Sequence, residues 1–231
     1  MTYQLLLHEN HPIIKPNEQT TILIDSGSPV TFHQQNQVNF EGSNYLAHID
    51  KQGINVNVIS TLAGIDITTL LGADIMSQYK ICLDYNNLTI AFEPLAYEIE
   101  EGDKINVEKF MGNLMLLPVQ INGQSVLGYL DTGAKLSYAS NQLTNGLAAN
   151  ENLEADFYIG LGAYQTNTFN TNATLSNGFT YEGKFGGQLP AQLASSFFGG
   201  QKQAIIGSDF FHACKKVWLD YSNSCIYIVT Y

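Results

Sequence analysis

Short apolar runs separated by turn residues make up most of the hydrophobic pattern of this 231-residue chain. The run Thr20–Ile24 has the apolar character of a buried strand. Residues 54–59 alternate apolar and polar side chains with a period of two, which also predicts a strand. Asn122-Gly123 lies between two further apolar runs and is the strongest short hairpin signal in the sequence. The pattern therefore predicts an all-β protein.

One short motif occurs twice, each time directly after an apolar run. Asp25-Ser26-Gly27 follows the first buried strand, and Asp131-Thr132-Gly133 follows the strand after the Asn-Gly turn. A carboxylate at the end of a strand, followed by a small hydroxyl residue and a glycine, suggests an acid held on a tight loop. A single copy would arise by chance in about one in ten chains of this length. The duplication therefore gives the motif its significance.

The two motifs belong to a longer internal repeat. Each is followed by an apolar-apolar-Gly block, a short helical pattern and a hairpin, in the same order. Two copies are too few for a solenoid, which needs roughly three or more, so the repeat predicts two halves related by a pseudo-twofold axis. Asp74 and Asp209 precede the short helical patterns, and we interpret them as N-caps. The matching blocks are residues 70–76 with 205–211, and residues 83–90 with 219–226.

An acidic stretch separates the two halves of the repeat. Residues 97–104 contain several acidic side chains and a glycine between two well-patterned regions, which is typical of a linker. The predicted N-terminal half is residues 1–96, and the predicted C-terminal half is residues 105–231. The second half has the longer segment between its acid motif and its downstream glycine block.

Together these motifs resemble those of the aspartic proteases, both the single-chain pepsins and the retropepsins, whose half-sized subunits pair. The resemblance implies an all-β acid-protease barrel fold with two retropepsin-like lobes, pseudo-twofold symmetry and short helices. Because both lobes lie in one chain, it also implies that a monomer suffices. The second loop, which continues into Ala134, fits the retropepsin form, whereas Pro29 after the first loop departs from it.

The resemblance assigns a chemistry to the two acids. Asp25 and Asp131 would meet as catalytic residues and share one proton, because two like charges so close together cannot both ionise. The ionised carboxylate would act as general base on a water, and the protonated one as general acid. The sequence does not decide which aspartate has which role. The expected activity is that of an aspartic endopeptidase, which hydrolyses peptide or protein substrates and needs no cofactor or metal.

The neighbours of the two aspartates would support the site. By resemblance, Ser26 and Thr132 hydrogen-bond across the interface between the loops and hold them together. Gly27 and Gly133 permit the tight backbone of each loop. Simple turn residues are the alternative interpretation of both hydroxyl side chains.

Enzymes of this family close a mobile hairpin, the flap, over the bound peptide. A glycine-rich stretch of the second half resembles the retropepsin flap. Residues 42–53 of the first half, which include Tyr45, are the alternative, since a first-lobe flap would match the pepsins. The sequence leaves this choice open. The candidate flap residues of the second half are Ile159, Gly160, Leu161, Gly162 and Tyr164.

Charge and composition narrow the range of partners and compartments. The net charge of −11 argues against nucleic acid and against an anionic membrane surface, and no segment reaches the roughly 18 apolar residues of a membrane span. The apolar run at the start is short for a signal peptide, so a cytoplasmic location is favoured and a secreted or periplasmic mature form stays open. Three cysteines give no disulfide framework, although one bridge between Cys214 and Cys225 stays open, and the histidines show no metal spacing.

Two other interpretations keep the fold without the chemistry. A catalytically inactive peptide-binding protein would bind a peptide in the same cleft and leave it uncut. A structural or inhibitory β-protein would use the duplicated loops for architecture alone, with aspartates too far apart to share a water. The separation of the two carboxyl groups tests the second interpretation, whereas the first differs from a protease in that the bound peptide remains uncut.

Overall fold

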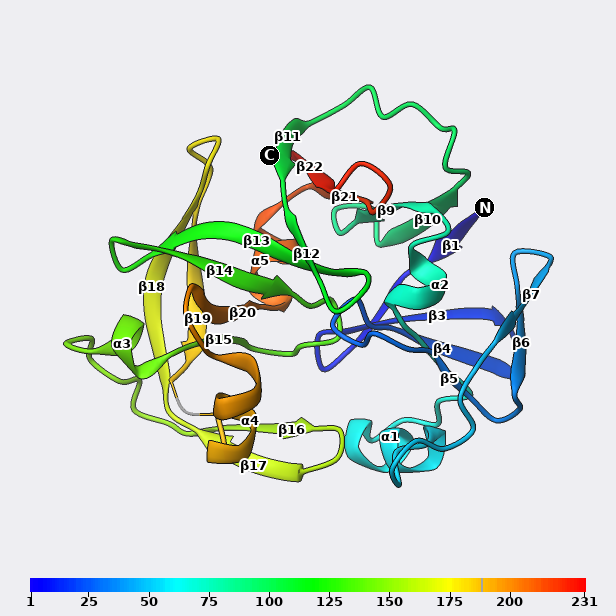
Figure 1. The fold of residues 1–231 in the computed structure, drawn as a ribbon, viewed down its shortest axis with the longest axis horizontal. Helices are drawn as coiled ribbons and strands as arrows, with labels where there is room; N and C mark the ends of the chain where they lie inside the picture. The colour runs from blue at the N-terminus through cyan, green and yellow to red at the C-terminus, as the bar shows by residue number, and fades with distance from the viewer. Residues whose placement is uncertain (188) are drawn as a thin grey trace.

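The computed structural model describes residues 1–187 and 189–231 and is mostly β. Among these residues, the strands form sheets of five, seven and six strands and two separate two-stranded hairpins. Figure 1 shows the five-stranded sheet and the seven-stranded sheet on opposite sides of the molecule, with the six-stranded sheet above both. The predicted all-β class is confirmed.

The N-terminal five-stranded sheet has the strand order β2-β3-β4-β8-β5. Strand β4 coincides with the predicted first buried strand and pairs in parallel with β8, so their C-terminal ends lie at the same edge. A separate hairpin, β6–β7, lies at the right of Figure 1. The bounds are β2 (Leu6–His8), β3 (His11–Asn17), β4 (Thr20–Ile24), β5 (Phe32–His33), β6 (Gln37–Phe40), β7 (Ser43–Leu46) and β8 (Thr69–Leu71).

The seven-stranded sheet has the order β12-β13-β14-β20-β15-β19-β18, and an additional pairing of β13 with β18 closes six of these strands into a barrel. Strand β14 pairs in parallel with β20, as β4 does with β8. A further hairpin, β16–β17, lies below the barrel in Figure 1. The bounds are β12 (Glu108–Phe110), β13 (Leu114–Ile121), β14 (Gln124–Leu130), β15 (Ser137–Ala139), β16 (Glu154–Tyr158), β17 (Gly162–Thr166), β18 (Thr168–Leu175), β19 (Thr180–Gly186) and β20 (Lys202–Ile206).

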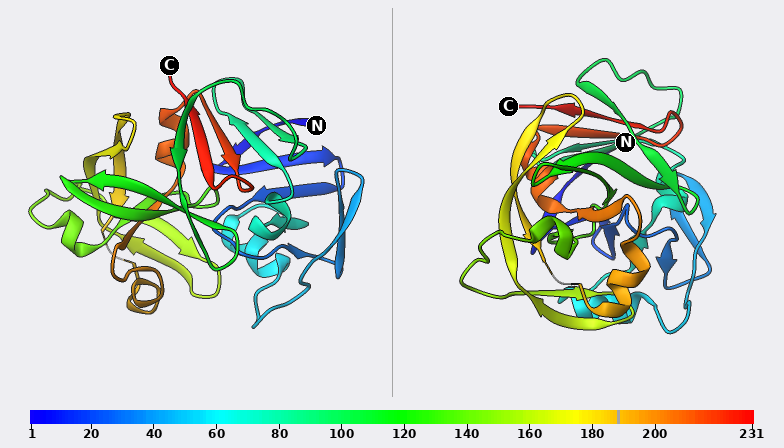
Figure 2. Two further views of the ribbon diagram at one scale, coloured as in Figure 1. Left: turned by 45° about the horizontal axis from the view of Figure 1, so that its top comes forward. Right: turned by 60° about the vertical axis from the view of Figure 1, so that its left-hand side comes forward.

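The six-stranded sheet combines strands from both predicted halves of the chain. Its order is β1-β10-β9-β21-β22-β11, and the antiparallel pair β9 and β21 joins the two halves. Both chain ends lie on this side of the molecule, where the red and cyan strands run side by side (Figure 2). The bounds are β1 (Thr2–Gln4), β9 (Lys80–Asp84), β10 (Thr89–Glu93), β11 (Asp103–Asn106), β21 (Lys216–Asp220) and β22 (Cys225–Val229).

The predicted linker, residues 97–104, crosses the outside of this sheet. The carboxylate of Glu101 accepts hydrogen bonds from Lys216 Nζ at 2.9 Å and from Trp218 Nε1 at 3.2 Å, and the ring of Tyr97 stacks on the Trp218 indole. Strand β11 begins at Asp103, so the last residues of the stretch pair with β22. The stretch is therefore attached to the sheet along its length.

The predicted hairpin at Asn122-Gly123 is confirmed. The two residues connect β13 to β14 in antiparallel register. Asn122 has φ 47° and Gly123 has φ 75°, the left-handed backbone that two-residue hairpin turns require and that Asn and Gly tolerate best. The turn thereby sets the register of β14, the strand that ends at Asp131.

The predicted strand at residues 54–59 is wrong, because most of this segment belongs to the first turns of helix α1. Asn55 is the N-cap, and its side chain accepts hydrogen bonds from two backbone N–H groups of the first turn. Val56, Ile59 and Ala63 are buried, at the spacing of one helix face. Only residues 54–58 alternate strictly, since Val58 and Ile59 are both apolar. So short a run is compatible with the period of a strand and with that of a helix, and the cap at Asn55 favours the helix. The helices are α1 (Val56–Ala63), α2 (Ala73–Met76), α3 (Asn141–Thr144), α4 (Ala191–Phe197) and α5 (Ser208–Ala213).

Asp74 and Asp209 are not N-caps, which corrects the sequence interpretation. Each is the second residue of its helix, α2 or α5, and the N-cap position is a glycine in both. The Asp74 carboxylate accepts hydrogen bonds from the backbone N–H of Thr31 at 3.0 Å and from its hydroxyl at 2.6 Å. The Asp209 carboxylate accepts one from the N–H of Lys184 at 2.6 Å. Both carboxylates therefore tie a short helix to a neighbouring segment.

All three cysteines are buried and free, so Cys214 and Cys225 form no bridge. Within the described residues, no helix has the length and apolar character that crossing a membrane requires.

Candidate active site

The two acid motifs lie at equivalent places in their sheets. Asp25 directly follows β4, and its N–H donates to the Leu71 carbonyl at the end of β8, at 3.0 Å. Asp131 directly follows β14, and its N–H donates to the Ile206 carbonyl at the end of β20, at 2.9 Å. In both cases a parallel neighbour fixes the backbone where the loop begins. The carboxyl groups are thus held on strand ends.

Ser26 and Thr132 cross-link the two loops, as the resemblance implied. The Ser26 hydroxyl donates to the Leu130 carbonyl at 2.8 Å, and the Thr132 hydroxyl donates to the Ile24 carbonyl at 2.9 Å. Each hydroxyl oxygen also accepts the backbone N–H of the other residue, at 2.9 Å. All four bonds are buried and join residues more than 100 positions apart. This network brings the two motifs together.

Gly27 and Gly133 allow each aspartate to pack against the opposite loop. A Cβ atom at Gly27 would lie 2.2 Å from Cγ of Asp131, and one at Gly133 would lie 2.6 Å from Cγ of Asp25. Both distances are far below van der Waals contact, so any side chain at either position would displace a carboxyl group. Glycine is needed at both positions because the aspartate of the opposite loop approaches so closely.

The two carboxyl groups lie close together, since each packs against the glycine of the opposite loop and each shifts the pKa of the other. Oδ1 of Asp25 also accepts the N–H groups of Gly27 at 3.0 Å and Ser28 at 2.9 Å, and Oδ1 of Asp131 accepts the N–H of Gly133 at 2.9 Å. Backbone donors and the partner carboxyl therefore orient both acids.

Burial raises the pKa of both acids. Loss of solvent contact raises the pKa of Asp25 to about 6, opposed in part by its backbone hydrogen bonds. Burial, followed by the charge of Asp25, raises the pKa of Asp131 well above its usual range. Two carboxyl groups in contact titrate as a pair, and the second proton is removed against the charge left by the first. The pair therefore holds one proton over a wide pH range.

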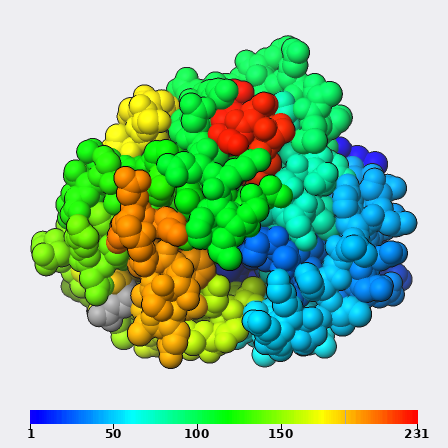
Figure 3. Space-filling model, viewed as in Figure 1, coloured from blue at the N-terminus to red at the C-terminus, as the bar shows by residue number. Residues whose placement is uncertain are grey.

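The aspartate pair lines a cleft of about 260 Å³. The N-terminal half contributes Phe32 and Ile54 to its wall, and the C-terminal half contributes Tyr138, Phe197 and Ile205. In the space-filling view, the orange segment that includes α4 faces the blue N-terminal segments across the middle of the molecule (Figure 3). The cleft thus combines a mostly apolar wall with two protonatable carboxyl groups, as ligand sites commonly do.

The glycine-rich candidate flap forms the hairpin β16–β17, and its residues Tyr158, Ile159 and Tyr164 line this cleft. At the tip, Gly160 has φ +95° and packs against Ile54, so the hairpin reaches the opposite wall. Gly162 has φ +100°, and Leu161 is exposed. Left-handed glycines at the tip of the turn and at the start of β17 allow the chain to reverse there.

The alternative flap, residues 42–53, lies mostly elsewhere. Tyr45 on β7 is hydrogen-bonded to Tyr79 through their hydroxyl groups, at 2.7 Å, and this hairpin packs on an aromatic cluster around Phe40 and Phe92. Only the end of the segment, at Lys51 and Gln52, reaches the cleft. The hairpin over the aspartates therefore comes from the second half of the chain.

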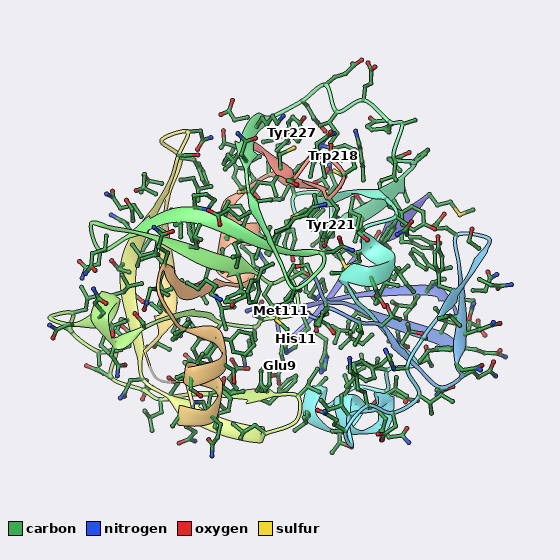
Figure 4. The ribbon with its side chains drawn as sticks, in the orientation of Figure 1. Glu9, His11, Met111, Trp218, Tyr221 and Tyr227 are labelled. Carbon is green, nitrogen blue, oxygen red and sulfur yellow. The ribbon has the colours of Figure 1, made fainter. Side chains whose placement is uncertain are left out.

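Sequence reasoning missed several polar residues of the cleft, among them His11, Tyr138 and Asp156. His11 begins β3, and its Nδ1 lies 2.8 Å from the carbonyl oxygen of Gly133, across 122 positions of sequence. Figure 4 shows His11 in the middle of the molecule. None of the three belongs to a recognisable local motif, because the contacts that define their surroundings are long-range. Among the described residues, no group of three or more His, Cys, Asp or Glu side chains could hold a metal ion.

No protein-family model matches the chain, and no curated protein matches it. The function must therefore be inferred from the geometry of the two loops and the cleft.

Proposed function

We propose that the protein is an aspartic endopeptidase that hydrolyses peptide bonds with a water activated between Asp25 and Asp131. The observation that carries the proposal is the contact of each aspartate with the opposite acid loop, which holds a buried and a half-buried carboxyl group together in a cleft lined by a glycine-rich hairpin. Interpretations in which the aspartates are too far apart to share a water do not fit this contact.

The proposal includes a two-lobed, pepsin- or retropepsin-like fold with a pseudo-twofold axis between the aspartates. Equivalent hydrogen bonds in the two halves support it. The N–H of Ala73 donates to the Ser28 carbonyl, and the N–H of Ser208 donates to the Ala134 carbonyl. The N–H of the glycine before each short helix donates to a hydroxyl group, that of Thr31 in the first half and of Ser137 in the second. Because both aspartates lie in one chain, a monomer suffices.

In the proposed mechanism, the ionised carboxylate removes a proton from the water as its oxygen attacks the scissile carbonyl carbon. The protonated carboxyl group hydrogen-bonds the carbonyl oxygen and transfers its proton as that oxygen acquires charge. The carboxyl group that took the proton from the water then gives it to the leaving nitrogen. The other carboxylate takes back a proton from a hydroxyl group of the tetrahedral intermediate as the intermediate collapses and the C–N bond breaks. The products are a carboxylic acid and an amine, and no covalent enzyme intermediate forms.

The substrate of this mechanism is an extended peptide. The hairpin β16–β17 offers its backbone above the aspartates, and apolar walls from both halves would receive side chains on either side of the scissile bond. Extended peptides gain affinity from backbone pairing and specificity from pockets for alternate side chains. The cleft of about 260 Å³ is smaller than the usual ligand pocket, and in the proposed mechanism the hairpin would lift to admit a peptide.

The direct test is cleavage of a mixture of unstructured peptides between pH 3 and pH 8, with the new termini read by mass spectrometry. We expect cleavage by the wild-type protein at acidic to neutral pH, where the pair holds one proton, and none by the double variant Asp25→Asn/Asp131→Asn. The matched control is Asp66→Asn, which alters an exposed carboxylate. Peptides that bind but remain intact at every pH would support the inactive peptide-binding protein instead.

A further inference from the structure

A third carboxylate, that of Asp156 on β16, lines the cleft and is used by no step of the proposed mechanism. Its side chain is buried, with 8% of its surface exposed. Its oxygens accept hydrogen bonds from the Tyr138 hydroxyl at 2.6 Å and from the N–H of Phe157 at 2.8 Å. Both donors are neutral, and no ion pair of Asp156 occurs in the described part of the chain.

The cations nearest to the cleft do not neutralise Asp156 by direct contact. Lys135 acts on it only at a distance, because its Nζ bonds Glu9 Oε2 at 3.1 Å and the Ala155 carbonyl at 3.3 Å. Lys51 is solvent-exposed. A buried carboxylate normally has a paired cation. Here the fold supplies none.

The hydroxyl groups beside Asp156 point their hydrogens toward it. Tyr164 donates to the Tyr138 oxygen at 2.9 Å, and Tyr138 donates to Asp156. A phenol has one hydrogen and two lone pairs. Because the Tyr164 hydroxyl already donates its hydrogen to Tyr138, it can only accept a further hydrogen bond. The chain of hydroxyl groups therefore offers acceptors, and no donors, to a ligand.

His11 adds a further acceptor beside the same part of the cleft. A carbonyl oxygen can only accept, so the 2.8 Å contact with the Gly133 carbonyl places a hydrogen on Nδ1 of His11. Burial lowers the pKa of His11, against opposing contributions from the Gly133 hydrogen bond and from Asp156. In the neutral ring, Nε2 carries a lone pair, and this atom is buried without a partner. The ring lies 5.3 Å from that of Phe157, next to Asp156 in sequence.

We propose that this corner, formed by Asp156, Tyr138, Tyr164 and His11, is a specificity subsite for a lysine or arginine side chain of the substrate. The inference rests on the proposed peptidase function and names the side chain that the cleft selects. An ammonium or guanidinium group brings a positive charge and several N–H donors, and no acceptor. It would supply the cation that Asp156 lacks and the donor that His11 lacks. The apolar wall beside the corner would cover the aliphatic stem.

Other side chains fit the corner less well. An acidic side chain would be repelled by Asp156 and by the charge on the aspartate pair. An aliphatic side chain would cover the acceptors and leave them unsatisfied, which costs free energy in a buried site. An amide carries an acceptor of its own and no charge. The net charge of −11 also favours the approach of a cationic peptide.

The test compares peptides that differ only in lysine, arginine, glutamine or norleucine at one position flanking the bond cleaved in the mixture. We expect the wild-type protein to prefer the basic peptides at one of these positions by about tenfold in kcat/KM. Asp156→Asn should reduce that ratio to near one, since the amide retains the shape and can still accept from Tyr138. Asp66→Asn, the matched control, removes one exposed negative charge outside the cleft and should keep the preference.

The possible outcomes separate this inference from the function on which it rests. Equal treatment of basic and neutral peptides at every position, or an equal loss of preference in Asp66→Asn and Asp156→Asn, would overturn the subsite. If the wild-type protein cuts no peptide, the peptidase proposal fails by itself. The same peptides are therefore also titrated calorimetrically into Asp131→Asn. There, tighter binding of the basic peptides supports the subsite, and equal binding overturns it.

Discussion

Asp131→Asn is expected to lower peptide cleavage by about a thousandfold or more, the scale of losing positioned acid–base catalysis. At the same time, it should stabilise the fold at pH 7. Asparagine keeps the shape of the side chain but cannot share a proton with Asp25, so no carboxyl group remains to complete the pair. The expected gain in stability has the same origin as the lost activity, because the native state holds two acids in contact and out of water.

The sign of the stability change follows from the raised pKa values. Burial raises the pKa of both acids in the native state, so above about pH 4 the native state binds more protons than the unfolded state. Stability therefore falls as pH rises from about 4 through the native pKa values, and Asp131→Asn removes part of that loss. We expect a gain in the free energy of unfolding on the order of 1–3 kcal/mol at pH 7. At pH 3 both acids are protonated in both states, and the gain should disappear.

Denaturant unfolding of the wild-type protein and the variant at pH 3 and pH 7 measures this difference. Asp66→Asn is the control for removing one negative charge from a chain of net charge −11, since Asp66 is exposed. A variant that cleaves normally, or whose free energy of unfolding relative to the wild-type protein does not rise between pH 3 and pH 7, would contradict the shared-proton account.

Gly27→Ala has the second largest expected effect. The added Cβ would lie 2.2 Å from Cγ of Asp131 and within 2.5 Å of both its oxygens, so the methyl group and the carboxyl group cannot both keep their places. The φ of Gly27 is not in the left-handed region, so the backbone itself accepts alanine. We expect the carboxyl groups to separate and peptide cleavage to fall by about a hundredfold or more, as misplacement by about 1 Å can cause.

Gly199→Ala provides the matched control, because a Cβ there meets no atom within 4 Å and its backbone is not left-handed. Cleavage rates and thermal unfolding of both variants give the comparison. Normal cleavage by Gly27→Ala would show that the opposite carboxyl group does not need its observed position.

The acid loops could be predicted from sequence because their chemistry is local. Asp25-Ser26-Gly27 and Asp131-Thr132-Gly133 each follow a continuous apolar strand, and the duplication identifies them as a pair. The hairpin at Asn122-Gly123 was predictable for the same reason, since two adjacent residues specify its turn. The candidate flap was visible as a glycine-rich stretch, but only its position over the aspartates distinguishes it from residues 42–53.

The remaining features depend on contacts that no local pattern encodes. Residues 54–59 alternate like a strand, yet Asn55 caps a helix, and the burial of Ile59 against the N-terminal sheet stabilises it. The sequence predicts that Asp74 caps a helix, because only the folded structure shows that its carboxylate accepts a hydrogen bond from Thr31. His11 and Asp156 acquire a role only when strands more than 100 residues apart enclose one cleft.

The most direct test of the central claim is a titration of the carboxyl carbons of Asp25 and Asp131 by nuclear magnetic resonance. If the two acids share a proton, both signals will respond to the same two ionisations, and the second will occur well above the ordinary aspartate value of about 3.9. Replacing either residue with asparagine will then change the titration of the other. Two independent ionisations near the ordinary value, each unaffected by removal of the other acid, would contradict the account.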